Sequence, residues 1–430
     1  MTAHHFTPRV ALAVIIANMI GTGVFTSLGF QLADTSSGFV LLMLWVVGGA
    51  AAFCGAMCYA ELGARLPRSG GEYNFLTQTI HPALGFVSGW ISATIGFAAP
   101  TALVAITFGK YLHLVVPAIS SVTAAIALVV ILSLAHASNH RRSGSTQFVF
   151  TVLKISMIVG FSVLALFLAD GQTAIRFVPK ISDAAEMTGS AFAVSLIYVS
   201  YSYSGWNAAT YFSDELENPQ RSLPWVLLTG CAIVTALYVL LNFTFLWVAP
   251  ADALRGQIEI VYIAAAYAFG DSVARVISAF MSLLLISTVS AMILAAPRVL
   301  QTIGQDFRAF RWLSRTNEDN IPYLAVYTQA AIALLLILTA TFESILVFSG
   351  FILALNTFAT VVGLFVLRRR EAGSTETFRV WAWPLPAVLF LCLTGWIIVH
   401  IVLNRPVEAL AGAGIIVAGF VMYYLFRNKT

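Results

Sequence analysis

The sequence predicts an all-α protein that crosses a membrane about twelve times. Of its 430 residues, 59% are hydrophobic and only 10% are charged, a composition typical of polytopic membrane proteins and far from that of soluble domains. Uncharged stretches of about 20 residues, the length that spans a bilayer as a helix, recur along the whole chain. Two of these stretches contain glycine-bearing interruptions, which predict helices that are broken inside the membrane.

The predicted spans form one transmembrane domain over residues 1–430. The first break lies in span one and the second in span six, so spans one to five (9–169) and spans six to ten (189–367) are candidate repeats, with spans eleven and twelve (382–426) outside them. Segment 251–270 is too short to span, and we expect it to lie as a re-entrant or interfacial helix on the outer side. The spans are placed at 9–33, 38–62, 83–109, 117–137, 147–169, 189–213, 223–248, 272–300, 322–341, 343–367, 382–403 and 408–426.

Lysine and arginine residues predict the orientation of the chain. With the N-terminus inside, 16 of the 23 cations fall on inner segments and 6 on outer ones, so the positive-inside rule predicts a multi-pass cell-membrane protein with both termini in the cytoplasm. The short polar lead before the first span lacks the features of a cleavable signal. The inner cations are Arg9, Arg65, Arg68, Arg141, Arg142, Arg221, Arg298, Arg308, Arg311, Arg315, Arg368, Arg369, Arg370, Arg379, Arg427 and Lys429, and the outer ones are Lys110, Arg176, Lys180, Arg255, Arg275 and Arg405.

Composition and spacing argue against other classes of protein. The net charge of +4 is small and gives no reason to expect nucleic acid binding. All four cysteines lie in apolar runs, so neither a disulfide framework nor a metal cluster is predicted. The seven histidines are scattered, without metal spacing or an obvious carboxylate partner. We therefore expect no enzymatic activity, no cofactor and no metal site, and no sensing domain or pore ring indicates a receptor or a channel.

The first break lies within Asn18–Thr26, in the middle of span one. Gly21 and Gly23 lie two residues apart, and glycine weakens helix interiors. Unpaired backbone groups are tolerated in a membrane only where they line a polar cavity, whereas close helix packing is the alternative explanation for two small residues. The motif Ser204-Gly205-Trp206-Asn207 in span six favours the broken helix, because paired breaks are typical of transporter binding sites.

Together the two breaks offer groups for both ends of an α-amino acid. The second half of span one begins near Thr22 and Gly23, where backbone amides and the positive end of a helix dipole suit a carboxylate. Free carbonyls around Tyr201 to Ser204, where span six is interrupted, suit an ammonium group. This pairing predicts a site for the carboxylate and the ammonium of one small molecule.

Lys154 lies inside a span, about two turns into span five from its inner end. A charge at this depth is costly and is expected to face partners inside the bundle. The alternative is a lysine whose ammonium group extends to the inner interface. The first interpretation makes Lys154 a candidate functional residue.

Several motifs carry a resemblance to a known family. They are Gly21-Thr22-Gly23, the turn Glu61–Tyr73, Tyr203-Ser204-Gly205-Trp206-Asn207, and Glu215-x-x-Asn218-Pro219 followed by Leu223-Pro224. With these motifs the chain resembles the amino acid–polyamine–organocation superfamily, most of all its L-type amino acid transporter branch, which includes bacterial neutral amino acid exchangers. The resemblance covers spans one to ten well and the last two only by hydropathy.

The resemblance implies a five-plus-five inverted repeat, with the substrate held between the breaks of spans one and six and alternating access around it. Thr22 and Gly23, beside Gly21, would hold the substrate carboxylate. Tyr201 lies where this branch has an aromatic gate, often Phe, and its extra hydroxyl is a departure that bears on the size of side chain admitted. The remaining substrate contacts implied are backbone at Ile20, Tyr201 and Ser204, the motif residues Tyr203 and Gly205, and Asn207 as a polar wall.

Lys154 matches the fifth-span lysine that, in sodium-independent members, stands where sodium-coupled relatives of the fold bind an ion. It would contact carbonyls of the first break and hydroxyls of span eight, and an ammonium with three donors is a reasonable substitute for a small cation. Obligatory exchange and proton symport through Lys154 both stay open, and sodium coupling ranks third because a resident ammonium would repel the ion. The candidate span-eight hydroxyls are those of Ser287, Thr288 and Ser290.

Neutral L-amino acids are the expected substrates. No Asp or Glu lies deep in any span, so a cationic amino acid or a polyamine would lack a buried counter-charge, and no spare arginine is placed to meet an acidic side chain. Tyr201 and the nearby aromatic residues favour small or medium substrates. Eukaryotic members of the branch join a single-span glycoprotein through an outer cysteine. Because no cysteine lies in an outer loop near spans three and four, we expect no disulfide-linked partner besides the lipid bilayer and the substrate.

Overall fold

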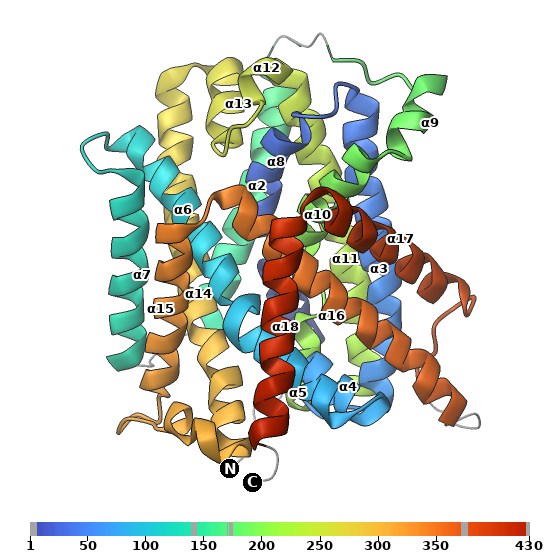
Figure 1. Ribbon diagram of the computed structural model, residues 1–430. Helices are drawn as coiled ribbons and strands as arrows, with labels where there is room; N and C mark the ends of the chain where they lie inside the picture. Colours follow the sequence, from blue (N-terminus) through green and yellow to red (C-terminus); the bar gives the residue numbers. More distant parts are fainter. Residues whose placement is uncertain (1–6, 139–143, 170, 172–174, 371–376, 427–430) are drawn as a thin grey trace.

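The computed structural model describes residues 7–138, 144–169, 171, 175–370 and 377–426, and over these ranges the fold is all-α, without a strand (Figure 1). Ten helical segments are long and apolar enough to cross a membrane. They are α1–α2 (Pro8–Met19 and Gly23–Gln31), α3 (Gly38–Arg65), α5–η1–α6 (Pro82–Ile91, Ser92–Gly96 and Ala98–Val115), α7 (Ser121–Ser138), α8 (Gly144–Leu168), α11 (Pro219–Val248), α14 (Asp271–Asp306), α16 (Phe342–Arg370), α17 (Leu385–Asn404) and α18 (Pro406–Phe426).

The other two predicted spans are also helical. Span nine corresponds to α15 (Tyr323–Thr339), which has 17 residues. Span six corresponds to α10 (Ser190–Tyr203), with 14 residues, followed by the 3-10 turn η2 (Ala208–Glu215). Neither reaches the length of an uninterrupted span, because α15 is short and α10 ends at its predicted break. The all-α polytopic fold class is confirmed.

The helix ends define two faces of the molecule (Figure 1). We call the face at which α18 ends and α4 (Gly71–Thr79) lies the terminal face. The short helices α9 (Ile181–Met187), α12 (Ala251–Leu254) and α13 (Ile260–Phe269) lie at the opposite face. The bundle of long helices runs between them, and the core is the apolar packing of these helices.

Segment 251–270 does not span the bundle. It forms α12 and α13, joined by a turn that lies on the end of α2. The Gly256 amide donates to the Gly29 carbonyl at 2.8 Å, and Arg255 Nε donates to the Leu32 carbonyl at 3.0 Å. A Cβ on Gly29 would overlap the Gln257 carbonyl oxygen, so the turn and α2 meet backbone to backbone.

The polar turn after span two holds a buried cluster. Glu61, near the end of α3, is fully buried and accepts hydrogen bonds from Arg368 Nε and the Val380 amide, each at 2.8 Å. Arg65 lies one helical turn along, 3.5 Å from the same carboxylate. The Glu61 carboxylate therefore forms ion pairs with Arg65 and Arg368, and these hold the ends of α3 and α16 together at the terminal face. Asp214 and Glu215 carry charges at the end of span six, and their side chains lie outside the described part of the chain.

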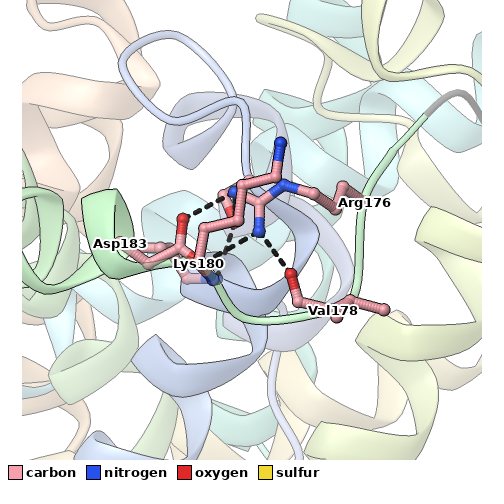
Figure 2. A network of polar contacts seen from close by, with 6 residues as sticks. Arg176, Val178, Lys180 and Asp183 are labelled. Atoms are coloured by element: carbon pink, nitrogen blue, oxygen red, sulfur yellow. Dashed lines mark hydrogen bonds and ion pairs between the residues drawn. The ribbon is translucent and has the colours of Figure 1, made fainter.

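An ion pair organises the connection that precedes α9 (Figure 2). Arg176 donates to both carboxylate oxygens of Asp183, at 2.6 and 3.1 Å, and the Lys180 amide donates to the same carboxylate at 2.7 Å. The guanidinium group also reaches the Ser37 hydroxyl at 3.3 Å, just before α3 begins. The hydrogen bonds from Arg176 lower the pKa of the Asp183 carboxyl to about 2. The loop before α9 is thus fastened to α3.

This lowered pKa gives the ion pair a defined pH range. The carboxyl has a pKa of about 3.9 when unfolded, so its contribution to stability is complete above that value and is lost as the pH falls through about 2. At pH 8 we expect Asp183→Asn to free the loop, so that trypsin cuts after Arg176 and Lys180 several-fold faster than in the wild type. Cleavage of the detergent-solubilised protein, followed by mass spectrometry, measures this rate. Equal cleavage rates would contradict the role of the pair.

Candidate functional site

The two broken spans meet at their breaks. α1 ends at Met19 and α2 begins at Gly23, while α10 ends at Tyr203. A Cβ on Gly23 would lie 2.7 Å from the Cα atom of Ser202, so the start of α2 contacts the end of α10 without room for a side chain. One turn further, the hydroxyls of Ser27 and Ser202 lie 3.1 Å apart.

The contact is reciprocal, because the segment after α10 lies against the end of α1. Gly205 has φ of +96°, in the region that favours glycine, and a Cβ there would lie 2.9 Å from the Asn18 carbonyl oxygen. Asn18 is exposed and Gly21, Ser204 and Gly205 are half-exposed, in the midst of buried helix. The unwound segments are therefore the accessible part of this contact.

The start of α2 presents unpaired amides. Among the first amides of α2, that of Phe25 donates to the Thr22 carbonyl at 2.9 Å. The amides before it have no partner within a helix, and α2 has neither a side-chain cap at Thr22 nor an acidic residue in its first turn. A Cβ on Gly21 would meet nothing closer than the Met19 carbonyl oxygen, at 4.0 Å. The positive end of the α2 dipole, which favours an anion, thus lies two residues from a position with open space beside its Cα atom.

The ends of α1 and α10 present carbonyls, and Tyr238 from α11 joins them. Its fully buried hydroxyl lies within hydrogen-bond distance of two carbonyl oxygens, those of Met19 at 2.5 Å and Ser202 at 3.0 Å. One hydroxyl proton therefore serves both carbonyls. Nothing in the sequence around Tyr238 signals this role, since it stands in a continuous apolar helix and its partners lie in distant segments.

We expect Tyr238→Phe to weaken the junction of the two breaks. The substitution keeps the ring and removes the donor, which leaves the Ser202 carbonyl short of a hydrogen bond at a cost of about 1 kcal/mol. Transport should fall several-fold, with a small drop in the melting temperature. Tyr111→Phe is the matched control, because this buried tyrosine accepts from the Val261 amide far from the breaks. Equal transport in the two variants would show that the hydroxyl of Tyr238 has no special part.

Lys154 on α8 faces the first break. It is 3% exposed, and its ammonium nitrogen donates to the Ile20 carbonyl at 3.2 Å. The carbonyl contact expected for Lys154 is therefore present. This is the one hydrogen bond made by the ammonium in the described part of the chain, so two of its three donors are unused.

None of the three candidate span-eight hydroxyls has a hydrogen bond to Lys154 among the described residues. Ser290 Oγ lies 2.7 Å from His136 Nε2 on α7, and we correct the prediction that it contacts Lys154. The Thr288 hydroxyl donates to the Leu284 carbonyl at 3.2 Å, as hydroxyls on helices commonly do. Ser287 is buried beside it on α14. Neither Ser287 nor Thr288 forms a hydrogen bond with Lys154 in this structure.

Two tyrosines of span six, Tyr201 and Tyr203, differ in the contacts that they make. Tyr201, the predicted gate, is 7% exposed, and its carbonyl accepts from the Ser204 amide at 2.9 Å. Tyr203 is 1% exposed and donates its hydroxyl to the Trp45 carbonyl at 2.9 Å, with its ring 5.0 Å from that of Tyr238. The side chain of Tyr203 packs between α3 and α11, and its contact with substrate stays a prediction.

Asn207, the predicted polar wall, is held by a residue that sequence reasoning missed. Its amide donates to the carboxylate of Glu72, on α4. Glu72 is 1% exposed although it stands in a turn that reads as polar loop. The glycines that precede it, Gly70 and Gly71, were the available signal, because they allow such a turn to pack closely against a neighbour.

Metal-binding side chains do not gather in the part of the chain that the structure describes: it contains no group of three or more His, Cys, Asp or Glu placed to hold an ion. The four cysteines are free thiols. The site consists instead of helix ends, hydroxyls and one ammonium group.

Comparisons with known proteins agree with this arrangement. The amino acid permease family profile matches residues 6–426. Relatives include the b(0,+)-type amino acid transporter 1 of Mus musculus, 27% identical over 96% of this chain and 86% of that protein. The serine/threonine exchanger SteT of Bacillus subtilis (strain 168) is 24% identical over 97% of this chain and 96% of its own. The Asc-type amino acid transporter 1 of Mus musculus is 26% identical over 97% and 81%. The chain therefore belongs to the amino acid permease family, whose members are multi-pass membrane proteins that transport amino acids.

Proposed function

We propose that this protein exchanges neutral L-amino acids across the cytoplasmic membrane, without sodium, by alternating access. The observation that carries the proposal is the contact between the start of α2 and the end of α10, where Gly23 lies directly against Ser202. This contact brings unpaired amides and surplus carbonyls together. An α-amino acid needs both kinds of group close together, because only a few bonds separate its carboxylate from its ammonium group.

The carbonyl side favours an ammonium group. The carbonyls of Met19, Ile20, Tyr201 and Ser202 each have two lone pairs. The Met19 carbonyl accepts from two donors, the Gly21 amide and the Tyr238 hydroxyl. The carbonyls of Ile20, Tyr201 and Ser202 accept from one donor each, namely the Lys154 ammonium, the Ser204 amide and the Tyr238 hydroxyl. Acceptors thus outnumber donors, and a substrate ammonium brings three donors to them.

The surroundings of the breaks favour a neutral side chain. The acidic residue bound to this region is Glu72, and both of its oxygens already accept hydrogen bonds, from Tyr59, Asn207 and Tyr211. The Glu72 carboxylate is therefore not available to pair with a cationic substrate. The serine/threonine exchanger and Asc-type relatives are consistent with amino acid substrates, and we extend that class to this chain as neutral substrates of small or medium size.

Lys154 supports sodium independence. Its ammonium occupies the Ile20 carbonyl that a cation would otherwise approach. A second candidate, proton symport, is favoured by the same residue, because a buried lysine with two unused donors is a group that a proton cycle can use. In both cases we propose that the halves 9–169 and 189–367 move around the site, with both termini in the cytoplasm.

Uptake into liposomes tests the proposal. Purified protein is reconstituted in sodium-free buffer, and uptake of labelled alanine, serine and leucine is measured with and without unlabelled amino acid inside, at equal and unequal pH. The same measurements are repeated with sodium added outside. Protein-free liposomes are the control. We expect uptake only with internal amino acid, indifferent to pH and sodium. Uptake into empty vesicles driven by an inward proton gradient would replace exchange by symport, and no uptake of any neutral amino acid would refute the proposed function.

A further inference from the structure

Glu72 is a buried carboxylate that the proposed transport cycle does not use. It is 1% exposed, and none of the ion pairs among the described residues includes it. Its ligands are neutral donors: the Tyr59 hydroxyl at 3.1 Å, the Tyr211 hydroxyl at 2.7 Å and the Asn207 amide. A buried carboxylate is costly unless it is hydrogen-bonded, and here three donors from two segments of the chain meet the charge.

The turn that carries Glu72 is pressed against η2. Gly71 has φ of +51°, and a Cβ there would lie 2.8 Å from the ring of Tyr211 and 3.1 Å from the hydroxyl of Thr210. Glu72 stands in the first turn of α4, where the helix dipole favours a negative charge. The backbone thus brings the carboxylate within reach of the segment that follows the break in span six.

Two of the three donors to Glu72 belong to that segment. Asn207 follows Gly205, which contacts Asn18 at the end of α1, and it begins the turn η2 that contains Tyr211. The Asn207 backbone carbonyl also accepts from the Thr210 amide at 2.9 Å. A bond at the side chain of Asn207 therefore fixes the segment between the accessible Ser204 and η2.

We propose that Glu72 is a positioning residue of the substrate site, whose carboxylate holds Asn207 and so sets the placement of the unwound segment of span six. The inference rests on the proposed function. Glu72 contacts no substrate itself. It acts through Asn207, and it makes the turn between α3 and α5 a determinant of substrate affinity.

Substitutions that exchange the carboxylate and the amide between positions 72 and 207 test this hydrogen bond. In Glu72→Gln, the amide oxygen can still accept from Asn207 and Tyr59, and its nitrogen can donate to the hydroxyl oxygen of Tyr211. Only the charge is lost, and a hydrogen bond to a charged group is roughly twice as strong as a neutral one. In Asn207→Asp, two carboxylates face each other and repel. In the double variant, the amide at position 72 can donate to the carboxylate at position 207, which restores the bond with the roles reversed.

The measurement is the KM for labelled amino acid in exchange, together with the melting temperature of each variant. We expect KM to rise roughly fivefold in Glu72→Gln, further in Asn207→Asp, and to return in the double variant to about the value of Glu72→Gln. Tyr59→Phe removes one hydrogen bond from the same carboxylate on the α3 side, and is the matched control. We expect it to lower the melting temperature with less than about a twofold change in KM.

Two results would overturn the inference. One is a wild-type KM in Glu72→Gln, and the other is a double variant as impaired as Asn207→Asp alone. If Asn207→Asp does not fold, the comparison of Glu72→Gln with Tyr59→Phe still tests the inference. If the carboxylate had only a structural role, both variants would have a lower melting temperature and neither would have a changed KM. Absence of exchange by the wild type, in the same vesicles, would instead refute the proposed function.

Discussion

Gly21→Leu is expected to abolish amino acid transport in a protein that still folds. Gly21 is half-exposed, and a Cβ there would have no neighbour closer than 4.0 Å. Its φ lies outside the region reserved for glycine, so a leucine backbone is allowed. The leucine side chain would fill the space in front of the α2 amides, where the proposed substrate carboxylate binds. Uptake into liposomes and thermal unfolding measure the two effects, and near-normal uptake would contradict the assignment of the first break.

Gly23→Leu is the matched comparison, because the same side chain is placed two residues away. Here a Cβ would overlap the Ser202 hydroxyl oxygen and lie 2.7 Å from the Cα atom of that residue. The two spans must then separate, and overpacking of this kind costs about 1–3 kcal/mol or more. We expect a clearly lower melting temperature and poor expression. Equal stability of the two leucine variants would mean that α2 and α10 are not in direct contact.

Lys154→Ala is expected to give folded protein with transport reduced at least tenfold. The substitution removes a hydrogen bond to a charged group, worth about 1.5–3 kcal/mol, from the Ile20 carbonyl. It also removes the charge that we propose replaces an ion, so the balance between the two access states should shift. A thiol probe at Asn18→Cys, in a background without native cysteines, reports this shift because Asn18 is exposed beside the break.

Lys154→Met separates charge from volume. Methionine retains most of the length of the lysine side chain without the ammonium, and we expect it to transport as poorly as Lys154→Ala while unfolding at a higher temperature. Full transport by Lys154→Met would show that the charge is dispensable. Unfolded protein in both variants would assign Lys154 a structural role.

Hydropathy predicted the fold well because each span must satisfy the same requirement of length and apolarity. The interruptions at Gly21–Gly23 and Ser204–Asn207 were also readable, since glycine and polar residues are conspicuous inside apolar runs. Apart from Gly70 and Gly71, nothing in the sequence indicated α4 as buried structure. Its composition is that of a loop, and its burial depends on η2, through Asn207 and Tyr211, and on α16, all of which are remote along the chain.

The side-chain contacts of the site were less predictable than its backbone. Helix ends carry their chemistry wherever they occur, so the roles proposed for Ile20, Thr22 and Gly23 follow from the position of the break alone. Tyr203 and Ser290 needed the rotation of a helix as well, and a residue in a fully apolar span can face either a substrate or a neighbouring helix. Tyr238 and Glu72 required knowledge of which distant segment each one meets.

The contact between the α12–α13 turn and α2 limits which substitutions this chain can accept during evolution. The turn is held largely by backbone, through the Gly256 amide and the close approach of the Gln257 carbonyl to Gly29. Side chains of the turn other than Arg255, whose Nε donates to the Leu32 carbonyl, can therefore change with little effect on its docking, while position 29 cannot gain even one carbon. Among functional sequences descended from this one, the turn should drift in composition except at Arg255 and at Gly256, whose φ of +71° favours glycine, and the glycine beneath the turn should stay fixed.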